Sequence, residues 1–309
     1  MYNNKNMFLV SFSIILLFCF VKCVNNSKDK NETNIKQELW SAYDDLKRPT
    51  LPENKIVAHR GGSIEKGCPD NSIEALNYAI DLGCYASECD IYLTKDERVI
   101  VAHADKNDMI NGLYPWEATY KEIISAGLLS NGEEIPLLEN YLERVVEAGT
   151  ILLWLDIKSI FALPIDEADE ISSRCAEIAS RIIKEMKADN FVEFIVAKEN
   201  ILERTLAASD GSWPCGLMNP KLSPDYYKEK SYNWANFSTS AIFYKNGEIK
   251  GDYTIEDYVD NGIRVSVYNV DSEDDRNWYT TREEYLYAIT TNYPYALLET
   301  RNNNKTDTR

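Results

Sequence analysis

The stretch YASECDIYLT, residues 85–94, decides the fold and points to the site. It is typical of a β-strand, and it carries Glu88 and Asp90 two positions apart. Side chains at positions i and i+2 of a strand point to the same side. Two carboxylates this close repel each other and cost free energy when they are buried. We therefore expect either a positive group between Glu88 and Asp90 or open water in front of them.

On both sides of this stretch, strand-like runs alternate with amphipathic helical runs. The predicted strands are 55–61, 85–94, 97–104, 150–158, 191–198, 213–219, 240–244, 263–270 and 287–292, and the predicted helices are 70–83, 133–149, 167–188 and 273–285. This alternation indicates parallel βαβ units. It predicts an α/β protein with one (β/α)8 TIM barrel at 51–300 and a polar tail at 301–309. A doubly wound open sheet is the alternative, but no glycine-rich dinucleotide loop follows the first predicted strand.

The composition limits the partners of the protein. The 309-residue chain is 44% hydrophobic and 27% charged, as in ordinary globular proteins, and its formal net charge is -17. Proteins bind a nucleic-acid backbone through a basic surface, so we expect no nucleic-acid partner. An anionic small molecule would have to meet a local cation, either a metal ion or a few Arg and Lys side chains.

Residues 1–23 predict a signal peptide, with the features of a lipoprotein signal. The apolar run at 7–21 is too short for a comfortable transmembrane helix and suits a signal-peptide core. Cys23 follows it and precedes a polar tether at 24–50, although Lys22 departs from the small residue that usually precedes such a cysteine. We expect an exported protein, either a periplasmic, outer-membrane or cell-surface lipoprotein attached through a lipidated Cys23 or a secreted protein. An uncleaved anchor is a further alternative.

The chain has only two histidines, and both lie near the end of a predicted strand. His59 belongs to the run at 55–61 and His103 to the run at 97–104. In α/β barrels the active site forms at the carboxyl ends of the strands. A single histidine in such a place is more often structural or exposed. Because both histidines flank the strand at 85–94, we favour a shared functional site.

A third acidic residue interrupts the very apolar strand TILLWLDIK. Asp156 lies near its carboxyl end, with Lys158 on the same face. One interpretation is a simple ion pair between these two side chains. The other is a site in which Glu88, Asp90 and Asp156 supply three oxygen ligands at one barrel mouth. Oxygen ligands suit Ca²⁺ or Mg²⁺ rather than zinc, and such a cation would offset the repulsion between the acids.

Two basic residues accompany these candidates. Arg60 directly follows His59, and Lys158 follows Asp156 at the i+2 position. Both would add positive charge near the cation, enough to hold one phosphate group.

Together these residues resemble the glycerophosphodiester phosphodiesterases over 55–300. The motifs that carry the resemblance are, in order, IVAHRGG, PDNSIEAL, LGCYASECDIYLTKDERVIVAHAD, SNGEEIPLLENYL, LLWLDIK, VSVYNV and ITTNYP. HRG alone would be a weak signal. The order and spacing of HRG, E-x-D, the second histidine and the acid-x-Lys strand are specific.

The resemblance implies a TIM barrel whose site has metal ligands, an acid/base pair and phosphate-binding cations. By this resemblance the site consists of Glu88, Asp90 and Asp156 for the metal, His59 and His103 for proton transfer, and Arg60 and Lys158 for the phosphate. The implied reaction is metal-dependent hydrolysis of a glycerophosphodiester to glycerol 3-phosphate and an alcohol. Its nucleophile is either the adjacent glycerol hydroxyl, through a cyclic phosphate, or water.

The chain departs from the usual family pattern at five places. They are Asp70 in PDN where PEN is usual, Ala104 between His103 and Asp105, Asp156 where Glu is usual, Tyr268 where Trp is common, and Asn292 in T-N-Y-P where T-D-x-P is common. The shorter Asp156 leaves room for a bridging water or a different ion. These changes affect the tuning of the site and leave its main residues in place.

Two other functions remain as alternatives on the same barrel. One is a phospholipase-D-like enzyme that acts on lysolipids or sphingolipids, which a lipid anchor near a membrane would favour. The other is a non-catalytic surface protein that binds a ligand without hydrolysing it. The expected partner in the leading interpretation is a small-molecule phosphodiester.

Overall fold

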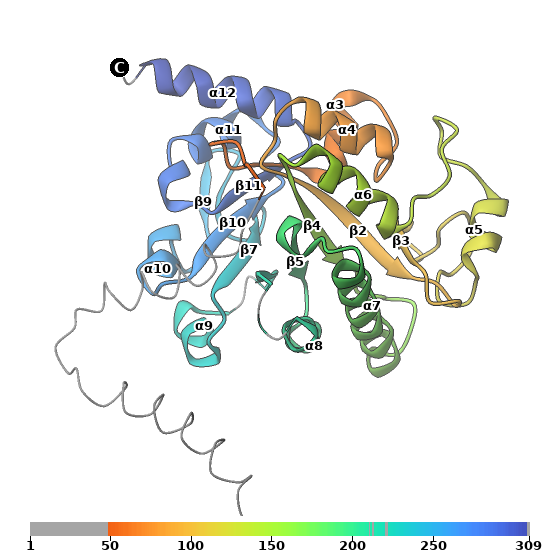
Figure 1. Cartoon of the computed structure of the whole chain (residues 1–309). Coiled ribbons are helices and arrows are strands. Elements are labelled where there is room, and N and C mark those ends of the chain that lie inside the picture. The colour runs from red at the N-terminus through yellow and green to blue at the C-terminus, as the bar shows by residue number, and fades with distance from the viewer. Residues whose placement is uncertain (1–48, 210, 212, 220–221, 308–309) are drawn as a thin grey trace, which may run out of the picture. The chain divides into compact units, whose positions relative to one another are not determined.

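Eight parallel strands close into a barrel in the computed structural model, which describes residues 49–307 except 210, 212, 220 and 221 (Figure 1). In chain order they are β1 (Ile56–Ala58), β2 (Ala86–Leu93), β4 (Leu152–Ile157), β5 (Val192–Val196), β6 (Cys215–Leu217), β7 (Trp234–Ser238), β10 (Arg264–Tyr268) and β11 (Ala288–Thr291). Around the barrel the order is β1-β11-β10-β7-β6-β5-β4-β2, and pairing of β2 with β1 completes the circle. The predicted (β/α)8 TIM barrel is confirmed, and its closure excludes the open sheet.

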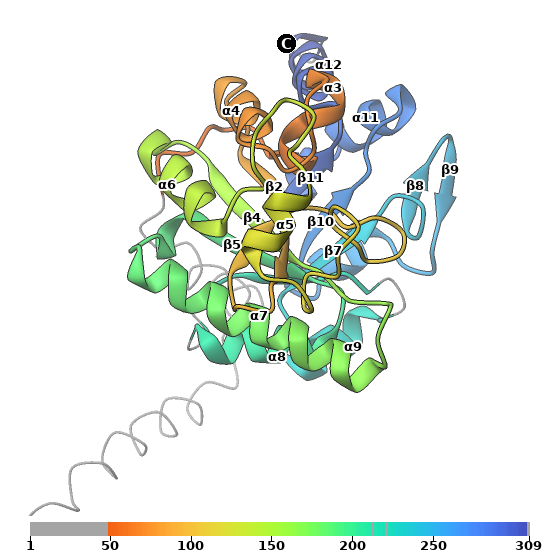
Figure 2. The same ribbon diagram turned by 90° about the vertical axis from the view of Figure 1, so that its right-hand side faces the viewer.

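At least one helix follows each barrel strand, and helices surround the barrel (Figures 1 and 2). The eight that precede the next barrel strand or end the chain are α4 (Ile73–Asp81), α6 (Leu138–Ala148), α7 (Ile165–Glu185), α8 (Glu199–Ala208), α9 (Pro224–Lys230), α10 (Ile255–Val259), α11 (Glu273–Thr280) and α12 (Pro294–Asp307). Side-chain caps fix where several of them begin. Ser72 accepts a backbone N–H at the start of α4, and Ser272 does so at the start of α11.

Apolar side chains pack on both sides of the barrel wall. The larger cluster lies between the strands and the surrounding helices. Inside the barrel, Trp154 and Trp234 meet edge to face with ring centroids 4.8 Å apart. Gly216 makes room for them, because a Cβ there would lie 2.8 Å from the Trp234 ring. Since Trp154 precedes Asp156 by two positions on β4, the indoles fill the barrel one layer beneath the acids.

The predicted strand at 97–104 is wrong as a barrel strand. β3 (Val99–Val101) pairs antiparallel with the second half of β2 and extends the sheet beside the barrel. Only residues 94–98 separate the two strands. So short a connection permits a hairpin, whereas a parallel neighbour needs a crossover of about a dozen residues. The expectation that His103 ends a barrel strand is therefore wrong.

The predicted strand at 240–244 is also wrong as a barrel strand. β7 takes that place, and β8 (Phe243–Lys245) pairs antiparallel with β9 (Glu248–Lys250) in a separate two-stranded sheet. Figure 2 shows this hairpin projecting beside the barrel. The polar residues Asn236 and Ser238 interrupt the apolar run that is typical of a buried parallel strand, which hid β7 in the sequence.

A small unit lies between β2 and α6. β3, α5 (Tyr120–Ala126) and their connecting loops pack around a cluster of their own that includes Ile100 and Ile123. The remaining short elements are the 3-10 helices η1 (His59–Gly62), η2 (Asp189–Phe191) and η3 (Glu283–Tyr285) and the helix α3 (Ser63–Lys66).

The predicted signal peptide at 1–23, with Cys23, lies outside the described residues, as does nearly all of the tether at 24–50. At the other end α12 continues through 301–307, and Arg301 Nε donates to Glu283 Oε1 at 2.7 Å. Among the helices of the described ranges, none combines the length and the apolar character needed to cross a membrane.

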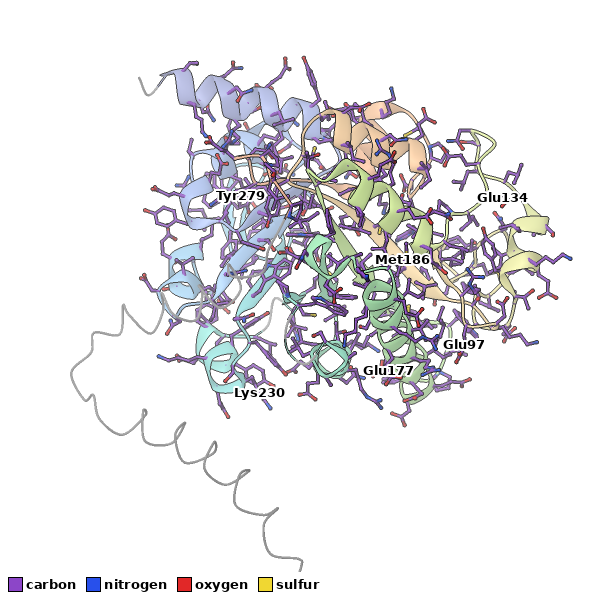
Figure 3. The ribbon with its side chains drawn as sticks, viewed as in Figure 1. Glu97, Glu134, Glu177, Met186, Lys230 and Tyr279 are labelled. Carbon is purple, nitrogen blue, oxygen red and sulfur yellow. The ribbon has the colours of Figure 1, made fainter. Side chains whose placement is uncertain are left out.

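Most charged side chains lie on the outside of the fold (Figure 3). Glu134 and Lys230 are exposed examples, whereas Tyr279 is fully buried. The hydroxyl of Tyr279 donates to the carbonyl oxygen of Tyr244 at 2.9 Å. Buried polar atoms in proteins usually have such a partner. A buried group of like charges is therefore unusual and calls for a physical reason.

The replacement of Gly61 by alanine is expected to destabilise the fold more than the same change at Gly67. Both glycines have left-handed backbones, with φ of +78° and +75°, which costs an L-residue about 1–2 kcal/mol. A Cβ at Gly61 would also lie 2.5 Å from the backbone of Ala75, whereas nothing lies within 4 Å at Gly67. We expect G61A to lose about 1–3 kcal/mol more than G67A in urea unfolding. Equal losses would contradict the close packing of η1 against α4.

Candidate active site

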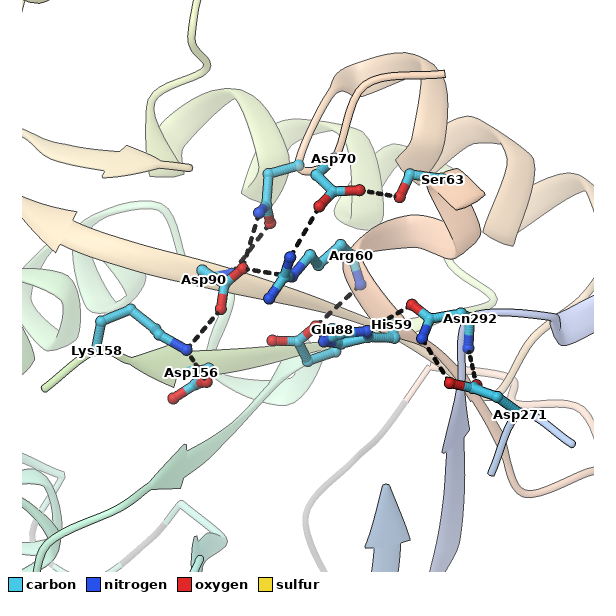
Figure 4. A network of polar contacts seen from close by, with 11 residues as sticks. His59, Arg60, Ser63, Asp70, Glu88, Asp90, Asp156, Lys158, Asp271 and Asn292 are labelled. Atoms are coloured by element: carbon cyan, nitrogen blue, oxygen red, sulfur yellow. Dashed lines mark hydrogen bonds and ion pairs between the residues drawn. The ribbon is translucent and has the colours of Figure 1, made fainter. Parts of the chain in front are cut away.

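A left-handed turn at the end of β1 presents His59 and Arg60 to the barrel mouth. Arg60 has φ +49° and ψ +37°, a conformation that is uncommon for a residue other than glycine. Its backbone N–H donates to Glu88 Oε2 at 2.9 Å. The turn therefore directs both a backbone donor and a guanidinium group toward the acids of the neighbouring strand β2 (Figure 4).

The three predicted acids converge at this end of the barrel. Glu88 and Asp90 lie on β2, and Asp90 is opposite Asp156 in the parallel register of β2 and β4. The three residues are only 2%, 1% and 7% exposed, in that order. One carboxylate oxygen of each lies within 4.8 Å of the other two. The i, i+2 spacing places Glu88 and Asp90 on one face of β2, and the register of the two strands brings Asp156 beside them.

Two cations neutralise part of this acid cluster. Lys158 Nζ lies 3.0 Å from Asp90 Oδ1 and 2.9 Å from Asp156 Oδ2. Arg60 Nε lies 3.0 Å from Asp90 Oδ2. Burial acts to raise the pKa of Asp90, but Lys158 and Arg60 bring this pKa below its ordinary value. Two positive groups therefore stand beside Asp90.

Glu88 and Asp156 are less well compensated. Burial raises the pKa of Glu88 well above its ordinary value, and Asp90 and Asp156 raise it further by repulsion. Burial likewise raises the pKa of Asp156. A preassembled set of oxygen donors with negative charge left over suits a hard divalent cation such as Ca²⁺ or Mg²⁺. The three residues fit such a cation, whose charge would favour their ionised forms.

His59 lies between the acid cluster and the end of β11. Its Nδ1 is 2.7 Å from Asn292 Oδ1, and its Nε2 is 3.8 Å from Glu88 Oε2. Burial lowers the pKa of His59, and the positive charge of Arg60 lowers it further. An imidazole that is neutral near neutral pH is suited to proton transfer.

His103 lies at the edge of the same mouth, in the loop after β3, and is exposed. The backbone N–H of the preceding residue, Ala102, donates to the carbonyl oxygen of Asp90 at 3.0 Å, which ties this loop to β2. Nearby protein groups shield His103 from part of its water, which lowers its pKa, and the negative charge of Asp90 opposes this change. The structure thus joins six of the seven predicted site residues by direct contacts and leaves His103 beside them.

A cavity of about 350 Å³ opens above the barrel centre at this site. The described residues that line it are His59, Arg60, Glu88, Asp156, Lys158, Ile195, Ala197, Met218, Asn236, Tyr268, Asn269 and Thr290. A larger cavity of about 630 Å³ lies around Lys55 and Arg301, and none of the predicted site residues lines it. Of these two cavities, the smaller one brings together acids, cations and an imidazole, so we regard it as the candidate active site.

Two residues before α4, Asp70 and Asn71 of the PDN motif, support the site. Asp70 Oδ2 accepts from Arg60 Nη1 at 2.8 Å. Asn71 Nδ2 donates to Asp90 Oδ2 at 2.9 Å, and the Asp90 N–H donates to Asn71 Oδ1 at 3.1 Å. The PDN motif thus orients Arg60 and Asp90. Sequence patterns could not show this, because the contacts depend on how α4 lies against β2.

If the site acts on a phosphodiester, as the resemblance implies, the change Asp70→Ala should raise its KM about tenfold while kcat changes less. Asp70 holds one end of the Arg60 guanidinium, and a hydrogen bond to a charged group contributes about 1.5–3 kcal/mol. Steady-state kinetics on purified protein would measure the change. Asp70→Glu, which restores the family's usual residue, serves as the matched control. An unchanged KM in Asp70→Ala would show that Arg60 needs no such support.

Comparisons with known proteins point to one family. A family model described as the glycerophosphoryl diester phosphodiesterase family matches residues 59–296. A glycerophosphodiester phosphodiesterase of Caldanaerobacter subterraneus is 32% identical over 149 residues, 46% of this chain and 56% of that protein. One from Bacillus altitudinis is 32% identical over 120 residues, 36% of this chain and 48% of that protein. The chain thus spans about half the length of these curated relatives.

Two solved structures share the barrel. A glycerophosphodiester phosphodiesterase from Parabacteroides distasonis has a TM-score of 0.67 at 23% identity, covering 84% of this chain and 99% of that one. An Oleispira antarctica phosphodiesterase, solved with the product sn-glycerol-3-phosphate, has a TM-score of 0.62 at 17% identity and covers 84% and 98%. These likenesses show the fold. Since the family model spans the barrel from His59 past the end of β11, the chain belongs to the glycerophosphoryl diester phosphodiesterase family.

Proposed function

We propose that the protein hydrolyses glycerophosphodiesters to glycerol 3-phosphate and an alcohol, with a divalent cation bound by Glu88, Asp90 and Asp156. The observation that carries the proposal is the meeting of these buried acids with two cations and an imidazole at one cavity. The family supports the reaction class. The Oleispira relative, which was solved with sn-glycerol-3-phosphate, supports the product.

The chain's own residues have three roles in this proposal. Arg60 and Lys158 hold the anionic phosphate at the mouth and stabilise the charge that grows on its oxygens. One of His59 and His103 accepts the proton of the attacking hydroxyl, and the other donates a proton to the leaving alcohol oxygen as its bond to phosphorus breaks. The bound cation would supply Lewis-acid stabilisation of charge on the phosphate oxygens. The attacking hydroxyl belongs either to the glycerol or to water.

The test is release of glycerol 3-phosphate from glycerophosphocholine by the purified protein. It is measured after chelation and after addition of Ca²⁺, Mg²⁺ or Mn²⁺ in turn. We expect turnover with at least one ion and loss of turnover with chelator. No turnover with any of the three ions would overturn the enzymatic proposal and favour a binding barrel. Faster turnover of lysophosphatidylcholine micelles than of the water-soluble substrate would replace the proposed substrate by a lysolipid.

A further inference from the structure

We infer that Asp271 and Asn292 are positioning residues that fix the proton of His59 on Nδ1, so that Nε2 keeps a free lone pair at the cavity. The inference deepens the proposed function, because it concerns the same imidazole, and its main test does not depend on activity. It rests on a short chain of hydrogen bonds that runs from Asp271 through Asn292 to His59 (Figure 4).

The contacts of Asp271 set the direction of this chain. Its Oδ1 accepts from the backbone N–H of Asn292 at 2.9 Å and from Thr291 Oγ1 at 3.1 Å. Its Oδ2 accepts from Asn292 Nδ2 at 2.8 Å. An ionised carboxylate can only accept hydrogen bonds, so the atom of the Asn292 side chain that faces it must be the NH₂ group. The amide orientation of Asn292 is thereby determined by chemistry.

The orientation of Asn292 in turn determines the tautomer of His59. With its NH₂ group turned to Asp271, Asn292 presents Oδ1 to His59 Nδ1 at 2.7 Å. A carbonyl oxygen only accepts, so Nδ1 must carry the hydrogen. The neutral ring then has its lone pair on Nε2, the nitrogen that lies 3.8 Å from Glu88 Oε2. His59 and Glu88 both line the cavity, so this lone pair is available at the site.

The fold explains why these three residues meet. His59 directly follows β1, Asn292 directly follows β11, and Asp271 lies three positions beyond the end of β10. These three strands are consecutive neighbours around the barrel. The N–H of Val270 also donates to the carbonyl oxygen of Thr290 at 3.1 Å, which holds the two later segments together. The ends of three adjacent strands thus place Asp271, Asn292 and His59 next to one another along the barrel rim.

A fixed tautomer matters because a histidine with the wrong nitrogen protonated cannot perform its proton transfer. With Nδ1–H held by Asn292, the Nε2 atom can accept a proton from a hydroxyl in the cavity. Without the hydrogen-bond chain, a fraction of the rings would turn an Nε2–H toward the cavity and could not act as a base. Both Asp271 and Asn292 act only through His59.

The test is ¹⁵N NMR of the imidazole nitrogens in the full chain, with chelator present, at a pH well above the ordinary imidazole pKa. The protein has only two histidines, so His103→Ala leaves the resonances of His59 alone. In this background we expect Nδ1 to show the pyrrole-type shift and Nε2 the pyridine-type shift. The reverse pattern of shifts in the chain that carries only His103→Ala would overturn the inference.

Three variants test the positioning residues in the same background. Asn292→Leu and Asp271→Asn should each give mixed tautomers, since the first removes the acceptor and the second frees the Asn292 amide to flip. The exchange Asp271→Asn with Asn292→Asp keeps an acceptor at position 292 and should restore Nδ1–H. Tyr293→Ser, a change at an exposed neighbour, is the control that should leave the spectrum unchanged. Retention of a pure Nδ1–H tautomer in both single variants would show that Asp271 and Asn292 do not position His59.

The two single variants protect the test against a failure to fold. If Asn292→Leu does not fold, Asp271→Asn alone decides between mixed and pure tautomers. The result is also separable from the proposed function. A fixed Nδ1–H in a protein without phosphodiesterase activity would support the positioning role and reject the proposed reaction. An active protein in which Nδ1–H is not fixed would support the reaction and reject the positioning role.

Discussion

The replacement of His59 by alanine is expected to lower kcat on a glycerophosphodiester by about 10²–10⁴-fold, the usual contribution of a general acid or base. His59 is the imidazole that lines the cavity, and it lies 3.8 Å from an acid of the proposed cation site. Its lowered pKa keeps it neutral and able to accept a proton near neutral pH. The measurement is release of glycerol 3-phosphate under saturating substrate and metal ion.

The companion variant to His59→Ala is the change of the other histidine, His103→Ala. His103 is exposed and lines no part of the cavity, so His103→Ala should fold as stably as the unchanged chain. Because His103 is the second proton-transfer residue of the proposed reaction, its loss should lower kcat although the stability is unchanged. His59→Ala with more than a tenth of the original kcat, in a protein with an unchanged circular dichroism spectrum, would show that the imidazole at the cavity is not catalytic.

The barrel was predictable because its signals are local. Alternating strands and helices indicated βαβ units, and the apolar runs of β4 and β5 marked buried strands. The two misplaced strands have different physical causes. For β3, the run at 97–104 follows the run at 85–94 after only two residues, a spacing that permits a hairpin but not a parallel crossover. For β7, Asn236 lines the candidate active-site cavity, so the strand lacks a fully apolar face, and the apolar run at 240–244 fits a buried strand better.

The relative positions of the three acids could be predicted from strand geometry. Glu88 and Asp90 share a face by their spacing, and Asp156 lies opposite Asp90 because parallel strands of a barrel align their carboxyl ends. The supporting contacts were not predictable. Asn71 and Asn292 reach the site only because a helix start and a distant strand end lie beside it. No periodicity within the chain reports a contact between segments 233 positions apart, as in the pair His59 and Asn292.

The change Glu88→Gln is expected to have opposite effects on activity and on the stability of the chelated protein. Activity should fall about 10²–10⁴-fold, because the proposed cation loses an anionic ligand and with it several kcal/mol of charge stabilisation. With chelator at neutral pH, the variant should instead unfold at a higher temperature than the unchanged chain. Burial and the neighbouring acids oppose the ionised form of Glu88, and a neutral amide removes that repulsion. Its carbonyl oxygen can still accept from the N–H of Arg60.

The pH dependence of stability in chelator follows from the same shift. The folded-state pKa of Glu88 lies above its ordinary value of 4.5, so the folded protein keeps this proton where the unfolded chain has lost it. The free energy of unfolding should therefore fall as pH rises from about 4.5 toward the folded-state pKa. Asp156 contributes in the same direction. Asp90, whose pKa is lowered, contributes stability that is lost as pH falls below its ordinary 3.8. Glu88→Gln should weaken the fall in unfolding free energy above about pH 4.5. It should leave unchanged the loss of stability below pH 3.8, which comes from Asp90.

The addition of a divalent ion should then make the wild-type protein more stable to unfolding than Glu88→Gln. An ion at 100 times its Kd stabilises the unchanged chain by about 2.7 kcal/mol, whereas the variant binds it less tightly and gains less. Glu134→Gln removes an exposed carboxylate away from the site and should behave as the unchanged chain in every arm. If Glu88→Gln and the unchanged chain unfold alike in chelator and gain equally from Ca²⁺ and Mg²⁺, the three acids do not form a cation site. A variant that is more stable than the wild-type protein in chelator and less stable with the ion would therefore show directly that these buried acids bind a cation.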